Sequence, residues 1–467
     1  MTTTPELAGL TIAEAAELIG SRRLSPIELT EASLSRIANL DARLRTFITV
    51  TRKEALGAAQ QAAHAIGSGN YKGPLHGIPF ALKDLFDTAG IRTTAGSKVL
   101  AERVASEDAA VTERLNEAGG VLVGKLNMHE FAFGVTGANP HYGTVENPWG
   151  RGRSAGGSSS GSAAAIASGM VPAALGTDTG GSIRIPAALC GITGLKPTYG
   201  RVSRRGVFPL SWALDHVGPM ARTAADLAIL LRVIAGHDQQ DATSSEEPVP
   251  DYVEELEDPR HLKRVRIGVP REYFFDNVEA EVLKALHDAI TVLGERKADL
   301  IEVAVPHISE ATAAATGILL PEALAVHRRW LSERPEDYGE DVRGRLDLGA
   351  AYPAVAYVEA QRFRSLIVEE WRRHVFDKVD LLVVPTTPVP APSLDEDVLQ
   401  VTLNLTRFTN PVNLLGLPAA SVPCGFTAAG LPVGMQLIGR WFEESLVLRA
   451  ANAYQHATDW HTRTPPL

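Results

Sequence analysis

Residues 154–200 read SAGGSSSGSAAAIASGMVPAALGTDTGGSIRIPAALCGITGLKPTYG, and this stretch decides the fold. Two loops dense in glycine and serine flank an apolar stretch that is rich in alanine. The first loop alone has the composition of a flexible linker, but a linker has no reason to continue into apolar sequence. Glycine-rich loops allow another group to approach the backbone closely. The stretch therefore predicts two ordered loops joined by a buried helix at the centre of the protein.

On both sides of this stretch, short apolar runs alternate with amphipathic segments. Such alternation is typical of an α/β protein, in which strands and helices follow each other in turn. We therefore predict a central mixed β-sheet surrounded by α-helices. The expected strands are 78–82, 121–123, 265–269, 381–384, 420–422 and 433–438, and the expected helices are 109–117, 278–293 and 443–458.

The chain opens with two helix signals. Thr11 with Glu14, and Ser25 with Glu28, have the spacing of capping boxes, so we predict helices over 11–20 and 25–40. In the later part of the chain, residues 237–262 are polar and acidic, and residues 300–375 have a mostly helical pattern. We treat residues 1–467 as one domain with an N-terminal helical region (1–75), a core (76–236), an exposed connection (237–262) and a helical cover over the substrate site (300–375).

Composition excludes several classes of protein. Of 467 residues, 45 are Lys or Arg and 55 are Asp or Glu, so the net charge of −10 gives no basic surface for nucleic acid. The two cysteines, Cys190 and Cys424, are too far apart in sequence for a metal-ligand pair or a disulfide framework. The N-terminus lacks the pattern of a signal peptide, and no apolar run is long enough to span a bilayer. We expect a cytoplasmic protein that does not bind a membrane.

The second glycine-rich loop carries the candidate chemistry. In Thr179-Gly180-Gly181-Ser182, successive N–H groups could converge beside a hydroxyl, as an oxyanion hole requires. Ser182 is therefore a candidate nucleophile, and a nucleophilic serine needs a base.

Histidines and a lysine compete for the role of this base. The nearby histidines, His129, His141 and His216, come without an obvious orienting acid. Lys83 follows the apolar run 77–82, so it emerges from a buried strand, where desolvation favours the neutral amine. A surface lysine paired with Asp84 is the alternative for Lys83 taken alone.

These motifs resemble the amidase signature family, whose members hydrolyse amides and related acyl bonds with a Ser, cis-Ser, Lys triad. The resemblance covers Gly77-Ile-Pro-x-x-x-Lys83-Asp84, then Gly156-Gly157-Ser158-Ser159 through Gly176-Thr-Asp-Thr-Gly-Gly-Ser182-Ile-Arg184-Ile-Pro, then Gly191-x-x-Gly-Leu-Lys-Pro-Thr-Tyr-Gly200. It implies Ser182 as the nucleophile, Ser158 as a proton bridge after a cis peptide bond, and Lys83 as the base. It also implies backbone N–H groups of residues 179–182 (Thr179, Gly180 and Gly181 before the nucleophile) as the oxyanion hole, and Asp178 and Arg184 as supports of the loop. No metal or cofactor is implied.

Two kinds of family member compete for the function. The stretches 128–132, 147–149 and 417–425 resemble the A subunit of the amidotransferase that releases ammonia from glutamine for an aminoacyl-tRNA. Those subunits usually carry a Ser-Asn-Leu-x-Arg-Tyr-Asp-Gly stretch, which residues 305–335 lack, and an acidic residue where this chain has Thr406.

We therefore expect an amide hydrolase that forms an acyl-enzyme on Ser182, and the alternative is the amidotransferase subunit. The expected partner is a small-molecule amide, anilide or carbamate, with no direct binding of nucleic acid, and the expected state is a monomer or homodimer. Met128 is our candidate for one wall of the pocket.

Overall fold

A single mixed sheet organises the molecule. The computed structural model describes residues 7, 9–256 and 262–467, and within them the strands form one eleven-stranded sheet in the order β1-β3-β2-β4-β6-β5-β10-β11-β9-β7-β8. β2 runs parallel to β3 and β4, β7 runs parallel to β8 and β9, and the other pairs are antiparallel. The strands are β1 (Phe47–Val50), β2 (Pro79–Lys83), β3 (Val121–Leu126), β4 (Ala173–Asp178), β5 (Thr193–Lys196), β6 (His216–Ala221), β7 (Arg266–Val269), β8 (Asp299–Glu302), β9 (Leu381–Pro385), β10 (Ala419–Phe426) and β11 (Pro432–Gly439).

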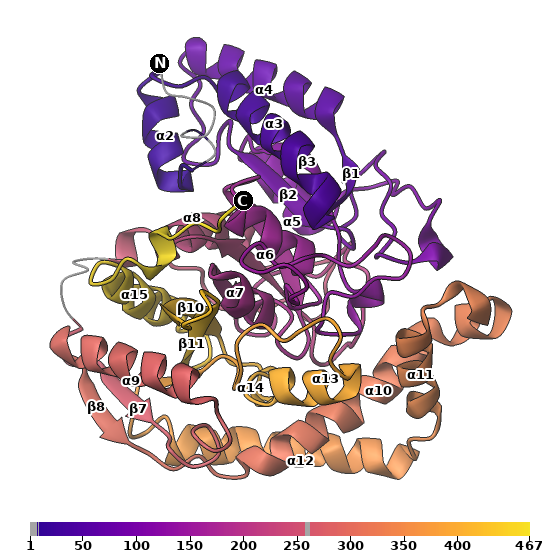
Figure 1. Cartoon of the computed structure of the whole chain (residues 1–467), viewed down its shortest axis with the longest axis vertical. Helices are drawn as coiled ribbons and strands as arrows, with labels where there is room; N and C mark the ends of the chain where they lie inside the picture. Colours follow the sequence, from indigo (N-terminus) through magenta and orange to yellow (C-terminus); the bar gives the residue numbers. More distant parts are fainter. Residues whose placement is uncertain (1–6, 8, 257–261) are drawn as a thin grey trace.

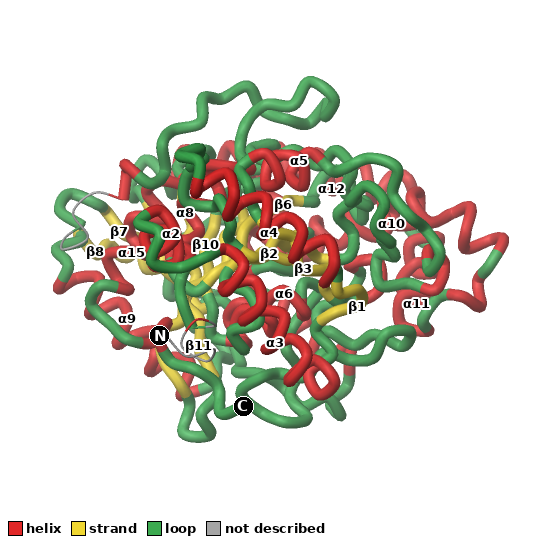
Figure 2. The backbone as a smooth tube through the Cα atoms, turned by 90° about the horizontal axis from the view of Figure 1, so that it is seen from above, coloured by secondary structure: helices red, strands yellow, loops and turns green. Residues whose placement is uncertain are grey.

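Helices surround this sheet, which confirms the predicted fold class (Figures 1 and 2). The helices are α2 (Ile12–Gly20), α3 (Pro26–Leu44), α4 (Arg52–Gly67), α5 (Ala110–Glu117), α6 (Ser160–Ala167), α7 (Arg184–Cys190), α8 (Ala224–Ile234), α9 (Ala280–Glu295), α10 (Ile308–Glu333), α11 (Glu340–Ala350), α12 (Ala354–His374), α13 (Val398–Thr406), α14 (Asn410–Leu415) and α15 (Glu444–Gln455). Among the described residues, none of the helices is long and apolar enough to cross a membrane.

The central strands are buried on both faces. In β2, Phe80 and Leu82 belong to the apolar cluster that includes α8, whereas Ala81 between them belongs to the cluster that includes α6. Successive side chains of a strand point to opposite faces, so a strand that is covered on both sides has to be apolar at every position. Burying a Phe or Leu side chain contributes about 1.5–3 kcal/mol. The continuous apolar run before Lys83 therefore fixes β2 in the middle of the sheet.

The two N-terminal capping boxes are present. Thr11 accepts a hydrogen bond from the N–H of Glu14 (3.1 Å), and the Glu28 carboxylate accepts one from the N–H of Ser25 (2.9 Å). These bonds satisfy N–H groups that the first turn of a helix leaves without partners. The predicted helices are thus confirmed as α2 and α3. α3 runs on to the buried Leu44, four residues beyond our prediction.

The acidic connection is bound to the core along much of its described length. Asp238 pairs with Arg205 (3.0 Å), and Tyr252 is fully buried. Only part of the predicted exposed connection is therefore exposed, and its residues 257–261 lie outside the described residues.

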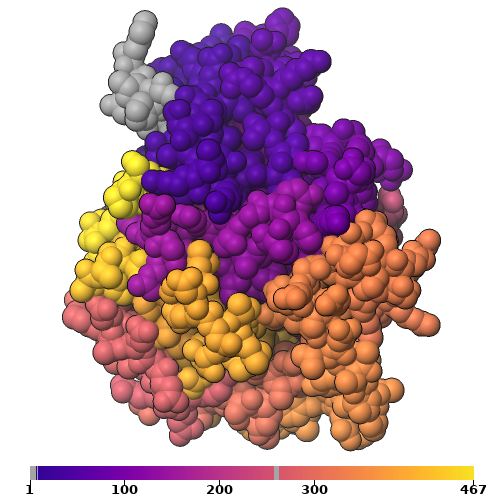
Figure 3. All heavy atoms as spheres, turned by 45° about the vertical axis from the view of Figure 1, so that its right-hand side comes forward, coloured from indigo at the N-terminus to yellow at the C-terminus, as the bar shows by residue number. Residues whose placement is uncertain are grey.

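The predicted cover region consists of β8 followed by α10, α11 and α12. Figure 3 shows these helices in orange against the purple and magenta core. α10 and α12 pack through an apolar cluster that also holds Leu382 and Val384 of β9, whereas Val342 and Leu346 of α11 belong to the cluster that includes α8. The position of the cover relative to the core matters because α10 and α11 supply part of the cavity described below.

Candidate active site

Lys83 is the last residue of β2 and is completely buried. Its Nζ donates hydrogen bonds to Ser158 Oγ (2.7 Å) and to Thr177 Oγ1 (2.8 Å). Burial lowers the pKa of Lys83 to about 7, although the charges of Asp178 and Asp215 act in the opposite direction. A lysine with this pKa is partly neutral near pH 7, and a neutral amine can accept a proton.

Ser158 lies where the first glycine-rich loop meets α6. It is fully buried, and the peptide bond between Gly157 and Ser158 is cis. The next residue, Ser159, donates its N–H to the carbonyl of Ser182 (3.2 Å). The two serine loops are therefore joined directly, and Ser158 lies between Lys83 and the second loop.

Ser182 lies just before α7 in a loop that Asp178 organises. The Asp178 carboxylate accepts the N–H groups of Gly181 (2.8 Å) and Ile183 (3.1 Å), which are the two neighbours of Ser182. Arg184 Nη2 pairs with the same carboxylate (2.8 Å). Burial alone would raise the pKa of Asp178, but Arg184 and the hydrogen bonds hold it well below its usual range. Asp178 and Arg184 therefore fix the backbone around Ser182.

The oxyanion-hole prediction needs one correction, at Gly181. Its φ of +127° and the 2.3 Å that would separate a Cβ from Thr409 Oγ1 explain why glycine occupies this position. Its N–H is already bonded to Asp178, so it is not free to bind an oxyanion. Thr179, Gly180 and Ser182 remain as candidate N–H donors, and all three line the same cavity. Sequence could not show this because it does not give the direction of the Asp178 side chain.

A cavity of about 570 Å³ opens over Ser182. Most of its wall is apolar, and the apolar side chains include Phe133, Val135, Leu210, Leu319, Leu320, Leu348, Val398, Leu399 and Leu403. Its charged residues are Glu340, Asp341 and Arg345, all from α11. Arg345 donates to Thr402 Oγ1 (3.2 Å) and lies over the ring of Phe133 (5.9 Å). The wall thus joins an apolar surface to one small charged region.

Met128 does not line this cavity. It is fully buried, and its Cγ lies 3.0 Å from where a Cβ on Gly96 would stand. The residues of this stretch that do line the cavity are 132–135, a few positions further along the chain. Met128 lies two residues beyond the end of β3 and is still packed in the interior, whereas the chain first reaches the cavity at Ala132, the last residue of the short helical turn at 130–132.

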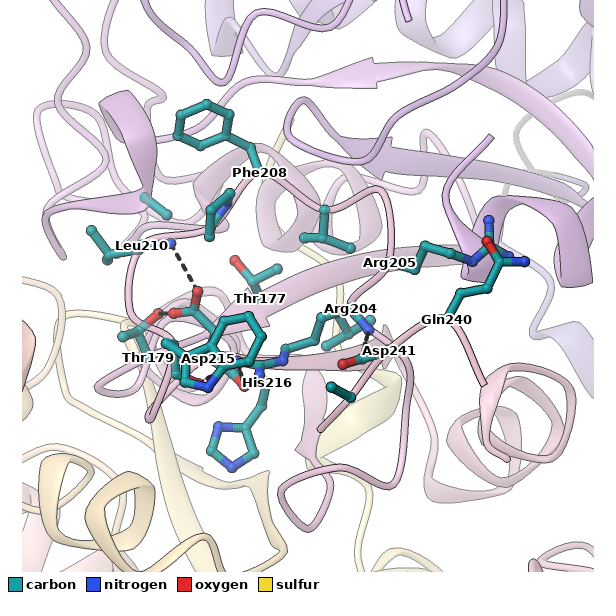
Figure 4. Close-up of a pocket in the computed structure, with 16 residues that line it drawn as sticks. Thr177, Thr179, Arg204, Arg205, Phe208, Leu210, Asp215, His216, Gln240 and Asp241 are labelled. Atoms are coloured by element: carbon teal, nitrogen blue, oxygen red, sulfur yellow. Dashed lines mark hydrogen bonds between the residues drawn. The ribbon is translucent and has the colours of Figure 1, made fainter. Parts of the chain in front are cut away.

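A second cavity, of about 310 Å³, adjoins the first (Figure 4). The two cavities share Ala132, Thr179 and Leu210. Asp215 accepts hydrogen bonds from Thr179 Oγ1 (2.6 Å) and from the N–H of Leu210 (2.8 Å), as the dashed lines in Figure 4 show. Burial raises the pKa of Asp215, although Arg204 and these bonds act against that effect. Asp215, which lines only this second cavity, therefore holds Thr179, which lines both.

The three histidines considered as bases are engaged elsewhere. His129 pairs with Asp341 (2.8 Å) and His141 with Glu130 (2.9 Å), so acidic partners do exist for both. Burial holds the pKa of His216 well below its usual value. Among the described residues, no side-chain hydrogen bond joins any of these rings to Ser158 or Ser182. Among the described residues, Lys83 is the only one of the four candidates whose side chain is hydrogen-bonded to a serine of the site.

Sequence analysis did not identify Thr177, Asp215 or Arg345. Thr177 lies inside the quoted GTDTGGS motif, so the polar position at the end of a strand was a usable signal. Asp215 and Arg345 had none, because each reaches the site only through the packing of a distant segment. Within the described residues, no group of three or more His, Cys, Asp or Glu side chains is arranged to hold a metal ion.

The chain is similar to known proteins along almost its whole length. A family model described as Amidase matches residues 28–448. A protein from Chloroflexus aggregans, named as the A subunit of glutamyl-tRNA(Gln) amidotransferase, is 46% identical over 488 aligned positions, which cover 99% of each chain. The solved structure of the same kind of subunit from Thermotoga maritima is 36% identical, with a TM-score of 0.84, and covers 98% of this chain and 97% of that one. A chain from a protein complex described as vestigial, solved to trace the origins of an s-triazine catabolic enzyme, is 36% identical, with a TM-score of 0.91 and coverage of 96% and 98%.

These relatives overturn one prediction. From the sequence we expected a small-molecule substrate without nucleic acid and a monomer or homodimer. Relatives that match along almost the whole chain are named as one subunit of an enzyme for glutamyl-tRNA(Gln), so that prediction of partners is wrong. The prediction relied on two local differences, the segment that residues 305–335 lack and the Thr406 position, whereas the similarity to these relatives extends along the full chain. The predicted family is confirmed, and the chain belongs to the Amidase family.

Proposed function

We propose that this chain cleaves a carboxamide C–N bond through an acyl-enzyme on Ser182. The observation that carries the proposal is the 2.7 Å contact between Lys83 Nζ and Ser158 Oγ, next to the loop of Ser182. Neutral Lys83 takes the proton of Ser158 while Ser158 takes the proton of Ser182. Ser182 Oγ then forms a bond to the carbonyl carbon of the amide.

The remaining steps follow from the same groups. N–H groups of residues 179, 180 and 182 bind the negative charge that develops on the carbonyl oxygen. The C–N bond breaks, and the leaving nitrogen recovers a proton along the path from Lys83 through Ser158. Water then attacks the carbonyl carbon of the ester and gives a proton to the same relay. The bond from that carbon to Ser182 Oγ breaks, Ser182 takes the proton back from the relay, and the acid leaves.

We further propose that the chain acts as the amide-cleaving component of a larger assembly, with glutamine as its amide. Full-length identity of 46% to a protein named as the A subunit of glutamyl-tRNA(Gln) amidotransferase supports this proposal. The charged residues of the cavity also support it, since Arg345 can bind the α-carboxylate of glutamine and Glu340 its α-ammonium group. Such an assembly would work in the cytoplasm, so the predicted location is kept as part of the proposal.

Two observations weigh against glutamine. Thr406 lines the cavity at the position where the amidotransferase subunits tend to carry an acid, and its hydroxyl donates to the carbonyl of Thr402 (2.8 Å). The stretch 305–335 lacks the segment named above. Glu340 offers a carboxylate from a different helix, so the charge needed for an α-ammonium group is available without Thr406.

A second candidate is hydrolysis of an amide that carries an extended apolar group. The apolar lining of the cavity favours it, because glutamine has little apolar surface to place against the leucines. The reaction at Ser182 is the same, so only the bound group distinguishes the two candidates.

A substrate comparison tests both. Ammonia release from glutamine and arylamine release from short-chain and ring-bearing anilides would be measured for the wild type and for Ser182→Ala. The proposal expects glutamine turnover that Ser182→Ala abolishes. Anilide turnover at least about 100-fold faster than glutamine turnover would establish the second candidate. Neither activity, or activity that survives in Ser182→Ala, would overturn the acyl-enzyme proposal.

A further inference from the structure

His129 lies between the catalytic loop and the helical cover and contacts both. It is 1% exposed and follows β3 by three residues. Its backbone N–H donates to the carbonyl of Ser158 (3.1 Å). Its ring Nε2 lies 2.8 Å from Asp341 Oδ2, on the first turn of α11. One residue thus touches the proposed proton bridge through its backbone and the cover through its side chain.

The chemistry of this pair fixes its direction. A carboxylate only accepts hydrogen bonds, so His129 Nε2 is the donor. Burial alone would raise the pKa of Asp341, but the bond from His129 and the nearby Arg345 bring it below its usual value. Within the described residues, His129 Nδ1 has no hydrogen-bond partner, so the only hydrogen bond of the ring is the one from Nε2 to Asp341.

A second contact also attaches α11 to the core. Glu130 is fully buried, and its Oε2 accepts the N–H of Gly339, the residue that precedes α11 (2.8 Å). Its Oε1 accepts from Ser97 Oγ (2.6 Å) and lies 2.9 Å from His141 Nε2. A buried carboxylate with this many partners is held rigidly. The N-terminal end of α11 is therefore attached to the core at two successive residues, 129 and 130.

The attachment of α11 at residues 129 and 130 positions the α11 side chains that line the cavity. Arg345 lies one helical turn beyond Asp341, and both line the cavity over Ser182. Gly134, which also lines that cavity, packs so closely on the His129 ring that a Cβ there would stand 2.1 Å from Nε2. A shift of the His129 ring therefore moves the cavity wall and the helix that carries Arg345.

We propose that His129 is a positioning residue that couples the Ser158 loop to α11 and so sets the distance between Ser182 and the charged group of a substrate bound at Arg345. This inference rests on the proposed function, in which an anionic group of the substrate contacts Arg345. It assigns His129 no part in proton transfer.

Steady-state kinetics with glutamine tests the proposal, because the α-carboxylate of glutamine is the group that we assign to Arg345. His129→Ala keeps the backbone N–H to Ser158 and removes only the ring. We expect KM to rise about tenfold and kcat to change by less than about threefold, because the substrate is held less well while the relay stays in place. His129→Gln, which keeps an N–H donor near the position of Nε2, should recover most of the loss. A fall in kcat with unchanged KM would overturn the proposal.

A double-mutant cycle gives a second criterion. Asp341→Asn combined with His129→Ala should raise KM no further than either change alone, because both remove the same contact. Independent, multiplicative effects would contradict the coupling. Asp380→Asn is the matched control: it weakens a similar pair, Arg266 with Asp380 (2.7 Å), between β7 and the start of β9, and it should leave KM unchanged.

Hydrogen exchange keeps the inference testable even if neither amide is cleaved, which would refute the proposed function alone. In His129→Ala, amides of 340–350 should exchange faster than in the wild type, and in Asp341→Asn the loop 156–160 should do so as well. Asp380→Asn should change neither segment. Faster exchange confined to the segment that carries the substitution would overturn the coupling.

Discussion

The core, which holds the proposed triad, and the helical cover face each other across one cavity but are built differently. Lys83 and Ser158 are fully buried and hydrogen-bonded to each other. On the cover side, Leu348 of α11 lines the same cavity together with Leu399 and Leu403 of α13, and these leucines are 59%, 65% and 55% exposed. Reacting groups have to be held rigidly, whereas a wall that selects substrates tolerates exchange. Changes in the core should therefore act on kcat, and changes in the cover on KM and on the choice of substrate.

The largest effect is expected at Ser182. Ser182→Ala removes the atom that forms the acyl-enzyme, so kcat should fall by roughly 10⁴–10⁶-fold, as in other coupled catalytic groups. Binding of the substrate, measured by calorimetry, should persist because the cavity wall is intact. Ser158→Ala should retain more activity than Ser182→Ala. Turnover in Ser182→Ala within tenfold of the wild type would show that the chemistry lies elsewhere.

The next effect concerns stability within the core. Arg184→Met leaves the buried Asp178 carboxylate without its guanidinium partner, and breaking a buried pair on one side costs about 3–5 kcal/mol. Denaturant unfolding should show this loss. The double variant Arg184→Met with Asp178→Leu should recover part of it, because no unpaired charge remains. A loss below about 1 kcal/mol in the single variant would mean that the pair does not support the loop.

A smaller effect, on KM rather than on kcat, is expected at Arg345 in the cover. Arg345→Met keeps the length and the apolar contacts of the side chain but removes its charge. For glutamine, KM should rise about 10–100-fold with little change in kcat, because a charged hydrogen bond made in both ground state and transition state is lost. A neutral anilide should be nearly unaffected. Equal losses for both substrates would argue against a role for Arg345 in binding a carboxylate.

The smallest effect is expected at the exposed rim. Leu399→Ser should change the unfolding free energy by no more than about 0.5 kcal/mol, since the residue is 65% exposed. Its kcat/KM for a ring-bearing anilide should fall a few-fold, and that for glutamine should stay the same. A similar fall for both would place Leu399 outside any apolar subsite.

Sequence predicted the core better than the cover for a physical reason. The strand before Lys83 is a continuous apolar run, and the serines stand in glycine-rich loops, so residue types alone indicate both. The orientation of single groups could not be predicted. The N–H of Gly181 is not free because it donates a hydrogen bond to the Asp178 side chain. Met128 is buried, and the first residue of its stretch that lines the cavity comes four positions later.

The cover could not be predicted because its role depends on distant contacts. Arg345 reaches the cavity because α11 packs against distant parts of the chain, among them His129 and Glu130, about 200 residues earlier. The sequence of α11 by itself is that of an ordinary charged surface helix. The prediction of partners was wrong for a related reason. It relied on a segment that the cover lacks and on Thr406 of α13, and both lie outside the core.

The pH dependence of kcat/KM tests the central claim, that neutral Lys83 is the base. Burial lowers its pKa from about 10.5 to about 7, so Lys83 is protonated below pH 7 and neutral above it. Measured from about pH 5 to 9, kcat/KM should rise about tenfold per pH unit below 7 and level off above it. Lys83→Arg, which stays charged, should be almost inactive at every pH. A profile that is flat across pH 7, or a Lys83→Arg variant that is as active as the wild type, would contradict the account.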